Sequence, residues 1–246
     1  MKIGILPDVQ AKHGNNFKFL ARVGRYFAEK RPDRIVCLGD FADMPSLSVY
    51  DEKGSKKAIG RTFKKDFAAA HRAMDTFMEP IARVPGYDPD LDMTLGNHDY
   101  RIERALNSDP RLEGTISLDM LRYEEYGWRV HEFLKVITIR DIAFSHYLTS
   151  GVKGLPITSA AALLSKRHMS TVVGHQQGCL MANAQRADGK QLTGIIAGSC
   201  YEHNEDFMGP QGNSHFRGFL MLHDVKPGGV FEPMAVSLSY LKKRYA

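Results

Sequence analysis

The sequence predicts an α/β fold that ends in a β-rich segment. Strand-like and helix-like stretches alternate from the N-terminus, and toward the C-terminus short apolar runs follow one another. The 246 residues suffice for one sizeable domain, or for two small ones at most. Because no sharp change in composition marks a boundary, we expect a single domain over residues 1–246.

The first part of the chain supplies three expected strands and two expected helices. Short apolar runs predict strands at Lys2–Leu6, Arg34–Leu38 and Asp92–Leu95. Apolar residues recur every three or four positions over residues 15–32 and again over residues 63–78, which predicts two amphipathic helices. Pro32 closes the first of these helical patterns.

Further strands are expected in the second part of the chain. Their apolar runs are Asp141–Ser145, Thr171–Val173, Leu192–Ala197, Phe216–His223 and Met234–Leu241. Together with the alternation before them, these runs indicate an α/β fold with a β-rich end.

Residues 44–62 are polar, contain glycine and proline, and predict an inserted loop. A run of six positive charges without an acid begins in this loop, and it exceeds the net charge of +5 of the whole chain. The run consists of Lys53, Lys56, Lys57, Arg61, Lys64 and Lys65. It is either a solvated face or a segment that attracts phosphates, and Lys53, Lys57 and Arg61 are candidate substrate-binding residues.

Several classes of protein are disfavoured. The three cysteines have neither disulfide-framework nor zinc-site spacing. No apolar run approaches the roughly 20 residues that cross a bilayer, and the N-terminal apolar stretch is too short for a signal peptide. We therefore expect a cytoplasmic protein without a membrane partner.

Five of the expected strands lead directly into residue types that bind hard metal ions. In chain order these residues are Asp8 and Gln10, Asp40 with Asp43, Asn97 with His98 and Asp99, His146, and His175 with Gln177. Ligands gather at the carboxyl ends of strands in open α/β sheets, so these residues at the five strand ends (the five tips) are expected to converge. Glycines precede three of the tips (Gly39, Gly96 and Gly174), where they allow tight turns and close backbone approach.

Such a mixture of carboxylate, amide and imidazole suits phosphate-ester chemistry. Two divalent ions about 3.5–4 Å apart can share one bridging hydroxide and hold a phosphate for in-line attack. Taken singly, a Gly-Asp pair is more often a turn, and a lone histidine such as His146 is more often structural. The order and strand context of all five tips together favour a metal site.

The motifs resemble the calcineurin-like metallophosphoesterase superfamily. The matching stretches are Asp8-Val9-Gln10, Gly39-Asp40-Phe41-Ala42-Asp43, Gly96-Asn97-His98-Asp99, His146 and Gly174-His175-Gln176-Gln177. Other segments resemble a phage- and prophage-encoded branch: Gly39–Asp51, Tyr147–Gln177 and Ile196–Tyr201. The resemblance implies a four-layer α-β-β-α sandwich of two mixed sheets flanked by helices.

The resemblance also implies roles for individual residues. Asp40 would bridge two ions, Asn97, His146 and His175 would complete the second ion's shell, and Asp8 would bind the first ion. His98 would stand beside the phosphate as acid and charge stabiliser. Asp99 would either orient His98 or brace the turn.

Two departures from the family pattern fall on the first ion. Gln10 and Gln177 stand where the family has histidines. Amide oxygens would favour Mn²⁺ or Mg²⁺ over Zn²⁺ in an oxygen-rich site, or that site would bind weakly or stay empty, so one or two ions are expected. Asp43, a candidate substrate-binding residue, is followed by Met44 where many members have arginine.

We expect hydrolysis of a phosphate ester by a metal-bound hydroxide, with a monoester or diester of nucleotide type as first choice. His13 follows the Asp8 loop and His203 follows a late strand, and either could line the pocket. One alternative is a nuclease that processes DNA or RNA ends. Another is a metal-binding scaffold without activity, although a scaffold has no need of His98.

Overall fold

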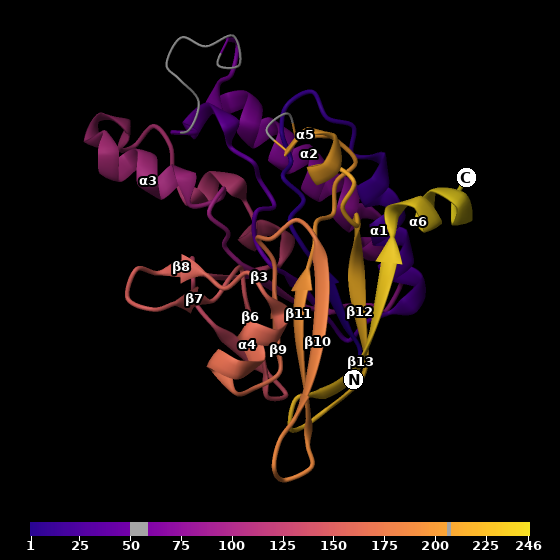
Figure 1. The fold of residues 1–246 in the computed structure, drawn as a ribbon. Coiled ribbons are helices and arrows are strands. Elements are labelled where there is room, and N and C mark those ends of the chain that lie inside the picture. Colours follow the sequence, from indigo (N-terminus) through magenta and orange to yellow (C-terminus); the bar gives the residue numbers. More distant parts are fainter. Residues whose placement is uncertain (50–58, 206–207) are drawn as a thin grey trace.

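The computed structural model describes residues 1–49, 59–205 and 208–246, and two large β-sheets form its centre (Figure 1). The first sheet has six strands. In spatial order they are β13 (Val230–Ser237), β12 (Gly218–Lys226), β1 (Ile3–Leu6), β2 (Arg34–Cys37), β3 (Asp90–Thr94) and β4 (Arg129–His131). Strands β1 to β4 are parallel, whereas β12 and β13 run antiparallel to their neighbours.

The second sheet has five strands and is also mixed. In spatial order they are β10 (Cys179–Gln185), β11 (Gln191–Ala197), β9 (Thr171–Val173), β6 (Ile142–Ser145) and β5 (Ile137–Ile139). Strands β11, β9 and β6 are parallel, and the two edge strands are antiparallel. A small hairpin of β7 (Thr149–Ser150) and β8 (Leu155–Pro156) stands apart.

Helices complete the described part of the chain. They are α1 (Lys18–Lys30), α2 (Phe63–Ala82), α3 (Arg101–Ser108), α4 (Ala160–Arg167), α5 (Gly209–Gly212) and α6 (Leu238–Arg244). No helix among the described residues is both long enough and apolar enough to span a bilayer.

Strand β2 and the residue after it show how the layers are assembled. Ile35 and Cys37 are buried in one apolar cluster with Phe27 of α1 and other residues of α1 and α2. Val36 and Leu38 belong to a different cluster, which lies between the two sheets. Because successive strand residues point to opposite faces, the first sheet separates the helices α1 and α2 from the second sheet.

Helix α4 covers the outer face of the second sheet. Leu163 of α4 is fully buried and shares a third apolar cluster with Val173 of β9 and Ile196 of β11. The order of layers is therefore α1 and α2, first sheet, second sheet, and α4 (Figure 1). This arrangement confirms the expected four-layer sandwich of two mixed sheets flanked by helices.

The expected strand Met234–Leu241 is wrong in its second half. Strand β13 ends at Ser237, whose Oγ accepts the backbone N–H of Tyr240 at 3.2 Å and so caps α6. Leu238 and Leu241, three positions apart, are 4% and 0% exposed. Their spacing buries one face of a helix rather than one face of a strand.

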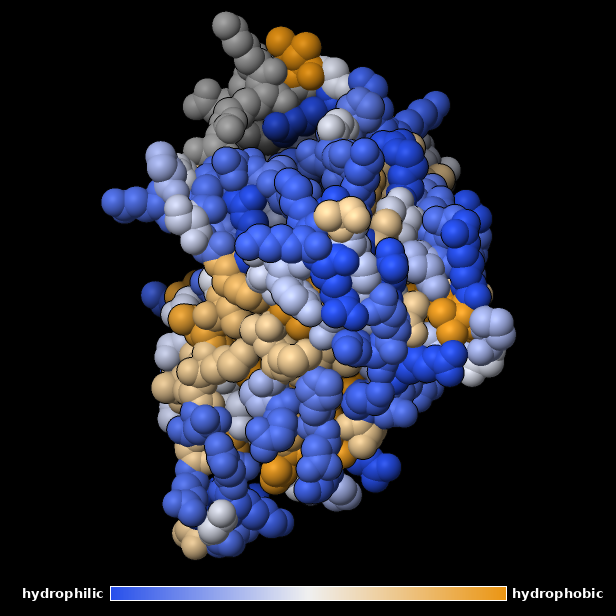
Figure 2. Space-filling view, turned by 90° about the vertical axis from the view of Figure 1, so that its right-hand side faces the viewer, coloured by the Kyte–Doolittle hydropathy of each residue, from blue (hydrophilic) through white to orange (hydrophobic). Residues whose placement is uncertain are grey.

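Each sheet has one edge strand on the same side of the molecule, β13 in the first sheet and β10 in the second (Figure 1). The face shown in Figure 2 is hydrophilic over much of its upper half and carries an apolar area lower down. The edge strands contribute exposed apolar side chains, with Leu180 and Met181 of β10 49% and 43% exposed and Met234 of β13 37% exposed.

Candidate metal centre

Four of the predicted ligands converge at the ends of β2, β3, β6 and β9. Nε2 of His146 lies 3.4 Å from Oδ2 of Asp40 and 3.0 Å from Oδ1 of Asn97. Nδ1 of His175 lies 2.8 Å from the same Asn97 oxygen and 3.2 Å from His146 Nε2. Among the described residues, Asp40, His146 and His175 form the one group of three histidine, cysteine or acidic side chains that could hold an ion.

The spacing of these atoms fits a divalent ion. Ligands that lie 2.0–2.2 Å from one ion, at angles near those of a tetrahedron or an octahedron, are roughly 3–3.5 Å from one another. The four contacts above fall in or just below this range. A donor set of two imidazoles, one carboxylate and one amide oxygen suits Mn²⁺, Fe²⁺ or Zn²⁺.

The ring of His146 is held in the orientation that ligation needs. Its Nδ1 donates a hydrogen bond to the backbone carbonyl of Leu38 at 2.7 Å, and the residue is fully buried. Such a bond fixes the tautomer, so Nε2 is the nitrogen that faces Asp40 and Asn97.

The loops that carry the ligands adopt an uncommon backbone conformation. Gln10, Asp40 and His175 have φ values of 47°, 50° and 68°, in the left-handed region that residues other than glycine seldom occupy. Strained backbone of this kind clusters at functional sites, because the surrounding structure must hold it in place.

Two of the glycines allow close approach to carboxylates, as predicted. A Cβ atom on Gly96 would lie 2.0 Å from Oδ1 of Asp40, and one on Gly174 would lie 2.6 Å from Oδ1 of Asp8. Backbone N–H groups bind the same two oxygens, that of His98 at 2.8 Å from Asp40 and that of His175 at 3.0 Å from Asp8. Larger residues at these positions would displace the carboxylates.

The site concentrates buried negative charge. Asp8 and Asp40 are 0% and 1% exposed. Burial raises the pKa of Asp8 to about 7. Burial also acts to raise the pKa of Asp40, but the charges of His146 and His98 hold it below its usual value. Burying carboxylates is costly unless a cation compensates them, and a divalent ion would do so here.

The two histidine ligands differ in electrostatic environment. Burial acts to lower the pKa of His146, but the carboxylate charge of Asp40, a hydrogen bond to it and the charge of Asp8 raise the pKa to about 9. Burial lowers the pKa of His175, and the charge of His146 helps to bring it to about 4.

The residues expected at the first ion are placed differently. Gln177 donates from Nε2 to Oδ2 of Asp8 at 3.2 Å, and its Oε1 accepts the hydroxyl of Tyr201 at 2.8 Å. In this orientation the amide nitrogen, not the oxygen, faces Asp8, so the amide would have to turn over to ligate an ion. Gln10 is buried, and its backbone N–H binds the carbonyl of Asp40 at 2.8 Å.

His98 lies beside the cluster and pairs with Asp43. Its Nδ1 donates to Oδ1 of Asp43 at 2.6 Å, while its Nε2 is 3.8 Å from Oδ2 of Asp40. Burial acts to lower the pKa of His98, but the charge of Asp40 and the hydrogen bond to Asp43 raise it above its usual value. The Asp43 carboxylate thus orients the imidazole, with Nε2 toward the metal cluster.

Asp99 braces the turn. Its Oδ1 accepts the backbone N–H of Ala42 at 3.1 Å and the hydroxyl of Tyr123 at 2.8 Å, and its Oδ2 accepts the N–H of Gly96 at 2.9 Å. The side chain is fully buried, and burial raises the pKa of Asp99. Of the two roles expected for Asp99, these contacts support bracing; the carboxylate paired with the His98 ring is that of Asp43.

An ion-pair network extends outward from Asp43. Lys12 Nζ lies 3.7 Å from Oδ2 of Asp43 and 2.5 Å from Oε1 of Glu205, which in turn is 2.7 Å from Nε2 of His203. His203 is therefore linked to the site through Glu205 and Lys12. His13, the other candidate pocket histidine, is exposed on the turn after Lys12.

Only part of the basic segment can be placed. Lys53 and Lys57 lie outside the described residues. Arg61 donates from Nη1 to the backbone carbonyl of Pro45 at 3.3 Å, close in sequence to Asp43. This contact places the side chain of Arg61, just before α2, beside the loop that follows Asp43.

Sequence reasoning missed Arg101, Lys12 and Glu205 as neighbours of the site. Arg101 donates from Nη1 to the backbone carbonyl of Asp43 at 2.7 Å and to its Oδ1 at 3.3 Å. Its position three residues after His98 was a usable signal, because a turn before α3, closed by a hydrogen bond from the N–H of Arg101 to the carbonyl of His98 at 3.1 Å, brings the two residues together. Lys12 and Glu205 are 193 positions apart, and nothing in the sequence pairs them.

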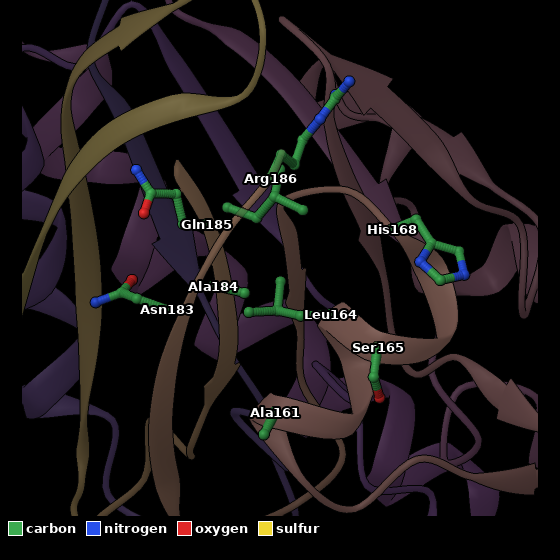
Figure 3. A pocket seen from close by; sticks show the side chains of 9 residues that line it. Ala161, Leu164, Ser165, His168, Asn183, Ala184, Gln185 and Arg186 are labelled. Atoms are coloured by element: carbon green, nitrogen blue, oxygen red, sulfur yellow. The ribbon is translucent and has the colours of Figure 1, made fainter. Parts of the chain in front are cut away.

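A cavity of about 540 Å³ lies elsewhere, between α4 and the hairpin of β10 and β11 (Figure 3). Side chains such as Leu164, His168, Asn183 and Arg186 line it. None of its lining residues belongs to the metal cluster or to its neighbours, so this cavity is separate from the candidate site.

No family model matches the chain. The Gene 54 proteins of Mycobacterium phages L5 and D29 are 32% and 31% identical to it over 100 residues. The matched stretch is 41% of this chain and 36% of each phage protein, so the chain spans little more than a third of these curated relatives. The two matches agree with the expected resemblance to a phage-encoded branch.

Several solved structures match almost the whole chain. They include a Zn²⁺ complex of Vps29 from Entamoeba histolytica (12% identity, TM-score 0.43), a dimetal phosphatase from Danio rerio (14%, 0.43) and the phosphoesterase Yfce from E. coli (12%, 0.41). Each match covers 97% of this chain. It covers 99% of the Vps29 chain, 99% of the dimetal phosphatase and 100% of Yfce. At such low identities and TM-scores, these likenesses transfer neither an activity nor a residue role to this chain.

Proposed function

We propose that this protein hydrolyses phosphate esters with the help of one or two divalent metal ions. The observation that carries the proposal is the juxtaposition of the metal cluster with the hydrogen-bonded pair of His98 and Asp43. The cluster of Asp40, Asn97, His146 and His175 would hold the tighter ion. When bound, the metal would supply Lewis acidity and an activated water for attack on phosphorus.

The side chains of this chain supply binding and proton transfer. Asp43 holds Nδ1 of His98, which leaves Nε2 directed to the side of the metal cluster. Burial acts to lower the pKa of His98, but the charge of Asp40 and the hydrogen bond to Asp43 raise it, which favours the protonated ring that a general acid needs. From Nε2, His98 would protonate the leaving oxygen of the ester.

The identity of the ions belongs to the same proposal. Asp8 would hold the first ion with Gln10 and Gln177, whose neutral amides are harder ligands than imidazole. For this oxygen-rich site we therefore propose Mn²⁺ or Mg²⁺ rather than Zn²⁺, and weaker binding than at the cluster. The contacts of Gln177 with Asp8 and Tyr201 support weaker binding, since ligation would have to replace them.

We propose a phosphomonoester or phosphodiester of nucleotide type as the substrate. The basic segment that contains Lys53, Lys57 and Arg61 supports this choice, because it could attract additional phosphates. A scaffold without activity would have no use for a histidine fixed at 2.6 Å by a buried carboxylate.

A substrate screen tests the proposed function. Manganese-loaded protein would be assayed against phosphomonoesters, phosphodiesters, cyclic nucleotides and single-stranded DNA. We expect turnover of a small nucleotide-type ester. Salt-sensitive cleavage of DNA alone would favour a nuclease, and metal binding without turnover of any ester would favour a scaffold.

A further inference from the structure

Arg101 is a buried cation beside the proposed site for which the mechanism above has no use. The residue is 8% exposed at the start of α3, and among the described residues Asp43 is the carboxylate with which it pairs. Burying a guanidinium is costly unless its donors are used.

The two nitrogens at the end of Arg101 face different groups. Nη1 is engaged by Asp43, through the backbone carbonyl at 2.7 Å and the carboxylate at 3.3 Å. Nη2 lies 3.4 Å from Nε2 of His98, which is long for a hydrogen bond. A guanidinium nitrogen carries two hydrogens, so Nη2 keeps a donor free for a group that binds beside Nε2 of His98.

A phosphoryl group would satisfy both donors. The acid role of His98 places an ester oxygen at Nε2, and the other oxygens on that phosphorus would then come within reach of Nη2. Guanidinium donors match the geometry of such anionic oxygens. The contact of Nη1 with the Asp43 backbone fixes the direction of Nη2 before any substrate binds.

Two other residues near Asp43 are not placed to donate to the phosphoryl oxygens. Lys12 already serves two carboxylates, at 2.5 Å from Glu205 and 3.7 Å from Asp43. Met44, directly after Asp43, is apolar and 0% exposed.

We infer that Arg101 is a substrate-binding residue whose Nη2 donates to a non-bridging oxygen of an anionic phosphoryl group held beside His98. This inference rests on the proposed function and deepens it, since the site would bind oxyanions of phosphate geometry rather than neutral esters. Arg101 is thus distinct from the metal ligands.

Binding of inorganic phosphate to the manganese-loaded protein tests the inference by calorimetry. Arg101→Met is expected to weaken phosphate binding about ten- to hundredfold, the scale of a charge-assisted hydrogen bond, with unchanged manganese content. Arg101→Lys keeps the charge but loses the planar pair of guanidinium nitrogens, so its affinity for phosphate should lie between those of wild type and Arg101→Met. Arg111→Met, whose native side chain is 89% exposed, is the matched control and should bind like wild type.

Unchanged phosphate affinity in Arg101→Met would overturn the inference and leave Arg101 as a brace for Asp43. If Arg101→Met does not fold, Arg101→Lys decides, and wild-type affinity there would also overturn it. Hydrolysis of p-nitrophenyl phosphate, measured in parallel, separates the two proposals. If wild type hydrolyses the ester and Arg101→Met binds phosphate as wild type does, only the role of Arg101 is contradicted. If Arg101→Met binds phosphate more weakly but wild type hydrolyses no ester, only the proposed function is contradicted.

Discussion

The imidazole of His98 and the carboxylate of Asp43 are 55 positions apart in the chain, and their Nδ1 and Oδ1 atoms lie 2.6 Å apart in the fold. Asp43 is itself held by Arg101 and Lys12, on its Oδ1 and Oδ2 sides respectively. A carboxylate fixed on both sides keeps the imidazole in one orientation, so the pair should act as a unit in catalysis.

Replacing His98 by alanine tests the acid role. Because a positioned general acid contributes typically 10²–10⁴-fold, we expect His98→Ala to lower kcat by about that factor. Manganese content, measured by elemental analysis, should stay at the wild-type level, since His98 is not a ligand. A variant that loses its metal would show that His98 ligates the ion instead.

Asp43 and Asp99 should respond differently to the same substitution. Asp43→Asn should chiefly lower kcat, by about 10²-fold or more, because it misdirects His98. Asp99→Asn should chiefly lower Tm, since an amide cannot accept all three of the hydrogen bonds from Ala42, Gly96 and Tyr123. Thermal melts and steady-state kinetics on both variants check the assignment, and the reverse pattern would make Asp99 the orienting group.

The convergence of the candidate ligands could be predicted from the sequence, because these residues follow strand ends. Asp40, Asn97, His146 and His175 each come directly after an apolar run, and parallel strands bring such positions to one edge. This reasoning needs only the positions of the strand ends, so it applies over the whole stretch from Asp40 to His175 without knowledge of packing.

Contacts across the fold could not be predicted in this way. Asp99 follows His98 in sequence and was the candidate partner, yet the turn directs its carboxylate to backbone N–H groups while Asp43 reaches His98 from another loop. The first residues of α6 read as a strand because Leu238 and Leu241 continue the apolar pattern of β13, and Ser237 was the overlooked capping signal.

Asp92 should make the stability of the fold depend on pH. It is 2% exposed and lies within 2.6–2.9 Å of Arg34, Arg129 and His131. Burial acts to raise the pKa of Asp92, but hydrogen bonds from Arg129 and His131 and the charge of Arg34 lower it below 3.8. A lowered folded-state pKa contributes stability above the unfolded pKa, and that contribution is lost as the pH falls through the folded-state value.

We therefore expect Asp92→Asn to lower the free energy of unfolding at pH 7 by about 1–3 kcal/mol, the cost of removing a buried charged acceptor from its hydrogen-bond donors. The difference from wild type should begin to shrink as the pH falls below about 4, where the carboxyl of the unfolded chain takes up its proton, and should shrink further at the lower pH where the folded carboxylate is protonated. Urea unfolding of both proteins at pH 7 and pH 3 measures this difference in the free energy of unfolding. A difference that stays constant over this range would show that the contribution is not electrostatic.

The two ions should bind with unequal affinity. Calorimetric titration of wild type should show one tight site and a weaker one, and Mn²⁺ should activate better than Zn²⁺. Gln177→His should tighten the weaker site by about tenfold or more, because imidazole is a stronger transition-metal ligand than an amide. Tyr201→Phe, which removes the same hydrogen bond to Gln177 without adding a ligand, is the matched control. Two equal, tight Zn²⁺ sites in wild type would contradict the assignment.

The most direct test of the account is the metal dependence of hydrolysis by wild type and His146→Ala. Both proteins would be depleted of metal, titrated with Mn²⁺, and assayed with p-nitrophenyl phosphate and bis(p-nitrophenyl) phosphate. Wild type should lose activity on depletion and regain it on reloading, whereas His146→Ala should stay inactive at Mn²⁺ concentrations that saturate wild type. Hydrolysis that persists without metal, or that is undiminished in His146→Ala, would contradict a catalytic metal held by this cluster.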